Sequence, residues 1–190
     1  MKNILDYSMV SESIIVFIDM QEKLVNAMPE DIAFTMSRQQ KLLNSAVHLN
    51  LPVIITEQYP RGLGNTVHSL KECFSSDWAV VEKNTFSCMG SDEFKDKLKD
   101  SGKKSVVICG IETHVCVLQT ALDCIRAGYR VIVLRDAVCS RNCIDRETAF
   151  LTMENAGVFF MTVESFLFMI LEDSKHPEFK KISKILASAD

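Results

Sequence analysis

Short runs of apolar, largely β-branched residues alternate along this chain with longer segments whose apolar residues recur at helical spacing. Runs that are apolar throughout predict buried β-strands, and they cover residues 13–18, 52–56, 78–82, 105–109, 130–134 and 158–162. Apolar residues three and four positions apart predict helices, and these cover residues 31–50, 92–99, 113–127, 143–155, 164–171 and 177–187.

This alternation predicts the fold class. Strands without an exposed polar face are typical of a parallel sheet that helices cover on both sides. Because crossovers between parallel strands are right-handed, we expect an α/β fold, a three-layer α/β/α sandwich with a six-stranded parallel sheet of the Rossmann-like kind. No repeat, low-complexity tract or linker divides the 190 residues, so we expect a single domain over residues 1–190.

Composition excludes several classes of protein. Hydrophobic residues make up 47% and charged residues 24%, which argues against a disordered chain. The net charge of −4 favours neither nucleic acid nor an anionic membrane as a partner. No apolar stretch is long enough to span a bilayer, and the first residues do not resemble a secretory segment, so we expect a cytoplasmic protein.

The seven cysteines are expected to be free thiols. Their odd number and irregular spacing argue against a disulfide framework. The sequence contains no CxxC motif and no His/Cys cluster at the spacing of a zinc site. Most of these cysteines are therefore expected to be small buried hydrophobic residues.

Chemistry is expected at one edge of the predicted sheet. In open parallel sheets, ligands bind beyond the carboxyl ends of the strands. The residues at those ends are Asp19 after the first strand, residues 56–59 after the second, Lys83 after the third, and residues 110–116 after the fourth.

Cys116 lies at the start of the helix that follows the fourth strand. Unpaired N–H groups and the positive dipole end of a helix lower the pKa of a thiol and can bind an oxyanion. We therefore interpret Cys116 as a nucleophile. Position alone does not separate this role from that of a buried core cysteine.

Asp19 and Lys83 each have an ordinary structural interpretation. An aspartate at a strand end can cap the following turn, and a lysine there can be a solvated surface residue. Together with Cys116, however, they supply a base, a positive charge and a nucleophile at one sheet edge, which is the set that an active site needs. Asp19 is then a general base, and Lys83 keeps it ionised.

Four motifs run in order through the chain: VFIDMQ with Asp19, VEKNTFSCM with Lys83, GIETHVCVLQTALD with Cys116, and RVIVLRDAVCSR. On these motifs the chain resembles the isochorismatase-like cysteine hydrolase superfamily. The segments TEQYPRGLGNTV and SKHPEFKKISKIL are most similar to its isochorismatase-domain-containing subgroup.

The resemblance implies the isochorismatase-like hydrolase fold, catalytic roles for Asp19, Lys83 and Cys116, and a homo-oligomer. It also implies a cis peptide bond between Ile111 and Glu112, which turns the backbone amides of Glu112 and Cys116 toward one oxyanion hole. Thr113 is expected to cap the following helix. The apolar residues at 166–171 fit an oligomer interface and core packing equally well.

Gln21, Tyr59, Phe86 and Thr113 are the candidate substrate-pocket residues, since they follow the same strand ends. Phe86 could equally be a core residue. Nicotinamidases of the superfamily bind a metal through an Asp-x-His pair and a further histidine after the second strand. Residues 57–64 of this chain contain no histidine, so we expect no metal and no cofactor.

The sequence leaves three functions open. The first is an enzyme that hydrolyses an amide, a related C–N bond or an ester of a small molecule through a thioester on Cys116. The second is a binding or scaffold protein that keeps the fold without turnover. The third is an isochorismatase-type hydrolase of a vinyl ether, in which the cysteine need not attack.

Overall fold

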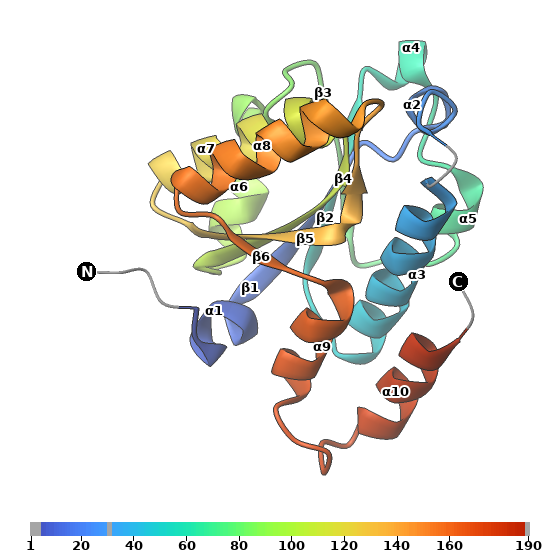
Figure 1. The fold of residues 1–190 in the computed structure, drawn as a ribbon, viewed down its shortest axis with the longest axis vertical. Helices are drawn as coiled ribbons and strands as arrows, with labels where there is room; N and C mark the ends of the chain where they lie inside the picture. The colour runs from blue at the N-terminus through green and yellow to red at the C-terminus, as the bar shows by residue number, and fades with distance from the viewer. Residues whose placement is uncertain (1–4, 30–31, 189–190) are drawn as a thin grey trace.

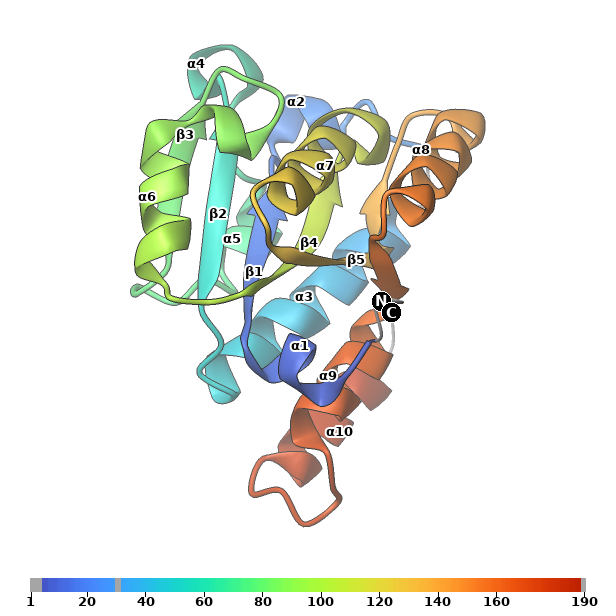
Figure 2. The same ribbon diagram turned by 90° about the vertical axis from the view of Figure 1, so that its left-hand side faces the viewer.

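A parallel sheet lies between two layers of helices, as the sequence predicts (Figures 1 and 2). The computed structural model describes residues 5–29 and 32–188. Its six-stranded sheet has the order β3-β2-β1-β4-β5-β6 within those residues, and every pairing is parallel. The strands are β1 (Ser13–Ile18), β2 (Val53–Gln58), β3 (Ala79–Lys83), β4 (Ser105–Ile111), β5 (Arg130–Cys139) and β6 (Phe159–Met161).

The helices divide between the two faces and the carboxyl edge of the sheet. One face packs against α1 (Tyr7–Ser11), α3 (Ile32–His48), α5 (His68–Lys71), α9 (Val163–Leu171) and α10 (Phe179–Ala187). The other face packs against α6 (Asp92–Asp100), α7 (Leu118–Arg126) and α8 (Cys143–Asn155). The short helices α2 (Glu22–Val25), α4 (Pro60–Leu63) and the 3₁₀ turn η1 (Cys88–Gly90) lie in loops that follow strand ends.

Side chains of β1 show why this sheet is covered on both faces. Ile15 and Phe17 lie in the core under α3 and α9, whereas Val16 and Ile18 lie in the core under α6 and α7. Successive side chains of a strand point to opposite faces, so a strand that is apolar throughout is buried on both. Complete burial of a side chain such as Phe17 stabilises the fold by roughly 1.5–3 kcal/mol.

The observed elements differ from the predicted ones mainly near strand ends. β5 continues to Cys139 instead of ending at residue 134, with a register shift opposite Ile108 and Gly110 of β4. The predicted helix at 113–127 begins with a π-helical turn over Thr113–Val117. The short helices α1, α2, α4 and α5 carry no long apolar period and were not predicted. Asp31, the first residue of the predicted helix at 31–50, lies outside the described residues.

The apolar residues at 166–171 belong mostly to the core. Phe166, Leu167 and Leu171 are buried in α9, and Phe168 is the exposed member of the run. Core packing rather than an exposed interface therefore accounts for most of this segment. Among the described residues, no helix has both the length and the apolar character that crossing a membrane requires.

Strands β1 and β4 lie side by side at the point where the strand order reverses. Gly110 makes their close approach possible, because a Cβ atom there would lie 2.1 Å from the carbonyl oxygen of Ile18. Its φ of 121° is also a conformation that favours glycine. The contact brings the end of β1 next to the loop after β4, which is the ligand-binding position of open α/β sheets.

We expect the substitution Gly110→Ala to lower the free energy of unfolding by about 3 kcal/mol or more, because a methyl group would force two backbones apart. Gly102→Ala is the matched control, since Gly102 also has a positive φ of 65° but has open space around it. Its expected loss is about 1 kcal/mol. Urea unfolding of both variants measures the difference, and equal losses would show that the close approach at Ile18 is unimportant.

Candidate active site

A buried ion pair joins the ends of β1 and β3. Asp19 follows β1 with a φ of 51°, and its backbone N–H donates to the carbonyl of Thr56 in β2 at 3.1 Å. Lys83 is the last residue of β3. Lys83 Nζ lies 2.6 Å from Asp19 Oδ2, and both side chains are completely buried. The two residues that sequence reasoning selected at separate strand ends are therefore in direct contact.

The ammonium group of Lys83 is surrounded by acceptors. Besides Asp19, it donates to Gln58 Oε1 at 2.7 Å and to the carbonyl oxygens of Thr85 and Phe86 at 3.2 and 3.1 Å. Burial lowers the pKa of Lys83, but the nearby Asp19 carboxylate and cysteine thiols outweigh burial and raise this pKa above its ordinary value. Lys83 is thus a stable cation at neutral pH.

The second carboxylate oxygen of Asp19 is also held. Thr56 donates its hydroxyl to Asp19 Oδ1 at 2.7 Å. One oxygen therefore faces a hydroxyl and the other an ammonium group, which fixes the plane of the carboxylate. Sequence reasoning selected Thr56 as a strand-end residue without recognising this contact.

Cys116 completes the cluster. Its Sγ lies 3.7 Å from Lys83 Nζ, and the side chain is 6% exposed. Cys116 sits in the π-helical turn between β4 and α7, a type of turn that is frequent at functional sites.

The expected direction of the pKa shift of Cys116 is wrong. Burial and the negative charge of Asp19 raise the pKa of this thiol well above its ordinary value, and Lys83 opposes them only in part. A hydrogen bond with Asp19 acts in the same direction as burial. The resting site therefore contains a neutral thiol beside a carboxylate, rather than the thiolate that a helix start alone predicts.

A second thiol borders the same carboxylate. Cys88 is fully buried in η1, and its Sγ lies 3.9 Å from the hydroxyl of Thr56. Burial and the charge of Asp19 raise the pKa of Cys88 to about 11. This thiol stays protonated at neutral pH and packs as a small apolar group.

Two candidate pocket residues have exposed side chains. Phe86 and Tyr59 are each 54% exposed. The backbone of Tyr59 has a φ of 37°. Its ring packs closely over Gly62, since a Cβ atom on that glycine would lie 2.1 Å from the ring.

The other two candidate pocket residues are buried. Gln21 is completely buried, and its side chain bonds to the backbone of Gln58 and Gly64. The expectation that Thr113 caps its helix is wrong. Glu112 holds the cap position, and the buried Thr113 hydroxyl has no hydrogen-bond partner among residues 5–29 and 32–188.

The loop before Cys116 is anchored through Glu112. The peptide bond between Ile111 and Glu112 is cis, at the position that the family resemblance implies. Glu112 Oε1 accepts a hydrogen bond from Arg141 Nε at 2.8 Å. His114 Nδ1 lies 3.0 Å from Ser140 Oγ, so the imidazole has a partner other than the thiol.

No group of three or more His, Cys, Asp or Glu side chains in residues 5–29 and 32–188 has the arrangement of a metal site.

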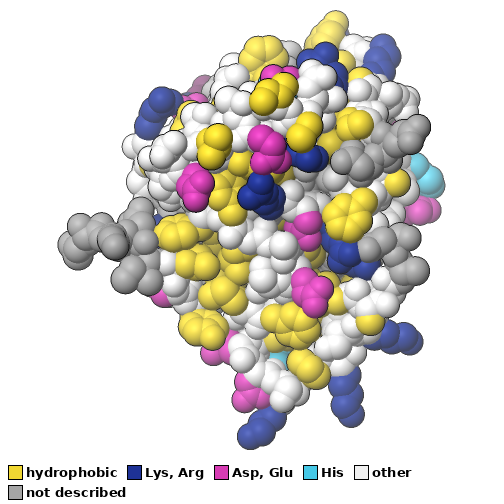
Figure 3. Space-filling model, viewed as in Figure 1, with side chains coloured by type: hydrophobic (Ala, Val, Ile, Leu, Met, Phe, Trp, Pro, Cys, Tyr) yellow, Lys and Arg dark blue, Asp and Glu magenta, His cyan; other side chains and the backbone are white. Residues whose placement is uncertain are grey.

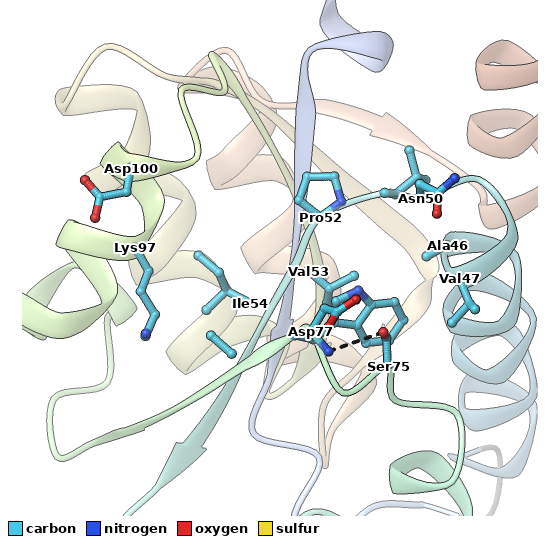
Figure 4. Close-up of a pocket in the computed structure, with 13 residues that line it drawn as sticks. Ala46, Val47, Asn50, Pro52, Val53, Ile54, Ser75, Asp77, Lys97 and Asp100 are labelled. Carbon is cyan, nitrogen blue, oxygen red and sulfur yellow. Dashed lines mark hydrogen bonds between the residues drawn. The ribbon is translucent and has the colours of Figure 1, made fainter.

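A hollow of about 440 Å³ lies at the other edge of the sheet, among the amino ends of β2 and β3 (Figure 4). Lys97 and Asp77 are among its polar residues. This hollow is not lined by Asp19, Lys83 or Cys116, so we place the candidate active site at the carboxyl edge of the sheet.

The sequence of this chain matches a known domain and a known vertebrate protein. The profile of the isochorismatase domain matches residues 13–165. Isochorismatase domain-containing protein 2 of Xenopus laevis is 38% identical over 177 residues, which are 92% of this chain and 83% of that protein.

Two solved structures share the fold over nearly the whole chain. The MAR1 ribonuclease of Caenorhabditis elegans has a TM-score of 0.88 and 37% identity, and the match covers 94% of this chain and 91% of that one. The YcaC gene product of Escherichia coli, an octameric hydrolase of unknown specificity, has a TM-score of 0.81 and 26% identity, with 95% and 94% covered. The domain match and the Xenopus relative agree with the four ordered motifs, and this chain belongs to the isochorismatase family.

Proposed function

We propose that this protein is a metal-independent cysteine hydrolase that cleaves an amide, a related C–N bond or an ester of a small molecule. The observation that carries the proposal is the contact of Lys83 Nζ with both Asp19 Oδ2 and Cys116 Sγ, at 2.6 and 3.7 Å. A base, a cation and a nucleophile in one buried cluster are the groups that acyl transfer needs.

In the first half of the reaction, Asp19 takes the proton of the Cys116 thiol while the sulfur attacks the carbonyl carbon of the substrate. The backbone amides of Glu112 and Cys116 stabilise the oxyanion. The bond to the amine or alcohol then breaks, and Asp19 returns the proton to that leaving group. In the second half, Asp19 takes a proton from water, the hydroxide cleaves the thioester, and the proton returns to the sulfur.

The charges of the cluster suit this proton transfer. In the resting state the ammonium group of Lys83 faces a carboxylate, and as the proton moves to Asp19 it faces the negative charge that develops on the attacking sulfur, so the net charge of the buried cluster and the substrate does not change. The raised pKa of Cys116 keeps the thiol protonated until a substrate is in place. Attack and proton transfer then proceed together, as expected for general-base catalysis.

The relatives bear on the substrate and the assembly. One similar structure bears the name ribonuclease. The net charge of −4 disfavours an RNA substrate for this chain, so we propose a small molecule instead.

The octameric state of the E. coli protein supports a homo-oligomer. Large hydrophobic side chains, including Ile144 and Leu151 of α8, are exposed, and hydrophobic side chains lie among charged ones on the face in Figure 3. We propose that residues 1–190 form one domain in each subunit.

We expect Cys116→Ala to abolish turnover in a screen of small amides, carbamates and esters, and Asp19→Asn to reduce it about a thousandfold or more, because the nucleophile and its base act as a unit. Cys143→Ala is the control, since Cys143 is an exposed thiol outside the cluster. Inactivity of the wild type toward every compound would favour the binding protein. Vinyl ether hydrolysis that survives Cys116→Ala would favour the isochorismatase-type reaction, and cleavage of RNA would contradict a small-molecule substrate.

We expect the pKa of the Cys116 thiol to shift in opposite directions when each of its two charged neighbours is replaced. Asp19 raises the pKa of this thiol and Lys83 lowers it. Asp19→Asn should therefore lower the pKa, and Lys83→Met should raise it. The pH dependence of Cys116 alkylation by iodoacetamide, followed by peptide mass spectrometry, measures both shifts. If either single variant does not fold, the double variant, which leaves no unpaired buried charge, still tests the electrostatic coupling. A higher thiol pKa in Asp19→Asn would contradict the arrangement.

A further inference from the structure

The side-chain amide of Gln21 is hydrogen-bonded to protein through both of its N–H donors and through its oxygen. Its Nε2 donates to the carbonyls of Gln58 at 3.0 Å and Gly64 at 2.6 Å, and its Oε1 accepts from the N–H of Gln58 at 2.6 Å. The residue is completely buried. A side chain whose donors and acceptor are already paired is poorly suited to bind a substrate, so its role as a candidate pocket residue needs another explanation.

The geometry of the sheet explains why Gln21 makes these bonds. The last residue of β1, Ile18, pairs with Thr56 of β2, and the chain then turns away at Asp19. β2 continues to Gln58, where the backbone N–H and C=O face a place that β1 no longer fills. The side-chain amide of Gln21 offers one carbonyl and one NH₂ group to these two positions. It therefore replaces the C=O and the N–H that a longer β1 would have supplied.

The bonds from the Gln21 side chain to the backbone of Gln58 form a clip, and Gln58 connects this clip to the ion pair of Asp19 and Lys83. It lies opposite Lys83 in the pairing of β2 with β3. Its side chain accepts a hydrogen bond from Lys83 Nζ at 2.7 Å and donates to the carbonyl of Asn84 at 2.8 Å. The backbone of Gln58 is thus held from the β1 side by Gln21, and its side chain is held on the β3 side by Lys83 and Asn84.

We propose that Gln21 is a positioning residue of the active site, which acts through Gln58 to hold the ammonium group of Lys83 between Asp19 and Cys116. This inference rests on the proposed function, since it assigns Gln21 to the same reaction. If the clip is lost, Gln58 can shift, Lys83 Nζ loses a short acceptor, and its support for the thiolate weakens. The pKa of Cys116 should then rise.

The test uses four variants of the full chain. Gln21→Met and Gln58→Met remove each amide while keeping side-chain length, and the double variant combines them. Gln39→Met is the matched control, because Gln39 is also a completely buried glutamine that donates to a backbone carbonyl, that of Ala137. Within the described part of the chain its other contact is with the sulfur of Met20, and not with Asp19 or Lys83. Should Gln21→Met not fold, Gln21→Asn keeps an amide that is one methylene too short to reach.

The first readout is the pH profile of Cys116 alkylation by iodoacetamide. We expect Gln58→Met to slow the reaction about tenfold at neutral pH, by the loss of a hydrogen bond to a charged group. Gln21→Met should slow it in the same direction, and the double variant should be no slower than Gln58→Met alone. The inference would be overturned if the slowing of alkylation in the double variant equals the product of the two single slowings. It would also be overturned if the pH profile of Gln21→Met equals that of Gln39→Met.

The second readout is the ¹⁵N–¹H resonance of the Lys83 ammonium group, which does not depend on activity. It should shift or broaden in Gln21→Met and Gln58→Met and match the wild type in Gln39→Met. An unchanged resonance in Gln21→Met would refute the positioning role even if the enzyme is active. A shifted resonance in Gln21→Met, together with a wild type that turns over no compound in the screen, would refute the proposed hydrolase and leave the positioning of Lys83 by Gln21 and Gln58 supported.

Discussion

The ion pair between Lys83 and Asp19 is the interaction on which the arrangement of the site depends. Removing two charges from water costs several kcal/mol per ion, and mutual attraction offsets that cost only if the remaining donors and acceptors are also paired. Here the carboxylate also accepts from Thr56, and the ammonium group also donates to Gln58 and to two backbone carbonyls. A complete set of partners lets both charges remain beside a thiol that is itself almost fully buried.

The fold supplies those partners because four strands end at the same edge. Asp19 turns out of β1, Lys83 closes β3, and Cys116 follows β4, while Gln58 at the end of β2 lies between the first two. Gly110 allows β4 to approach β1 closely enough for the third group to reach the first. The site therefore depends on backbone contacts between strands as much as on the charged side chains themselves.

The sequence predicts the sheet, its longer helices and the three central residues of the candidate site for a simple physical reason. Apolar runs mark strands, parallel strands expose their carboxyl ends at one edge, and Asp19, Lys83 and Cys116 each follow such a run. The predicted family is confirmed by the domain match.

Other features depend on contacts between distant segments. The bonds between Gln21 and Gln58 join residues 37 positions apart. The pKa of Cys116 rises because burial in the surrounding core and the charge of Asp19 outweigh the charge of Lys83. The failure of Thr113 as a cap follows from the π-helical turn, which no local pattern indicated.

We propose that the sulfur of Cys116 carries the acyl group during hydrolysis. Rapid quenching of the enzyme with a substrate found in the screen, followed by peptide mass spectrometry, tests it most directly. We expect an acyl adduct on the peptide that contains Cys116, formed and consumed at least as fast as turnover. Steady turnover without any adduct on that peptide, undiminished in Cys116→Ala, would contradict it.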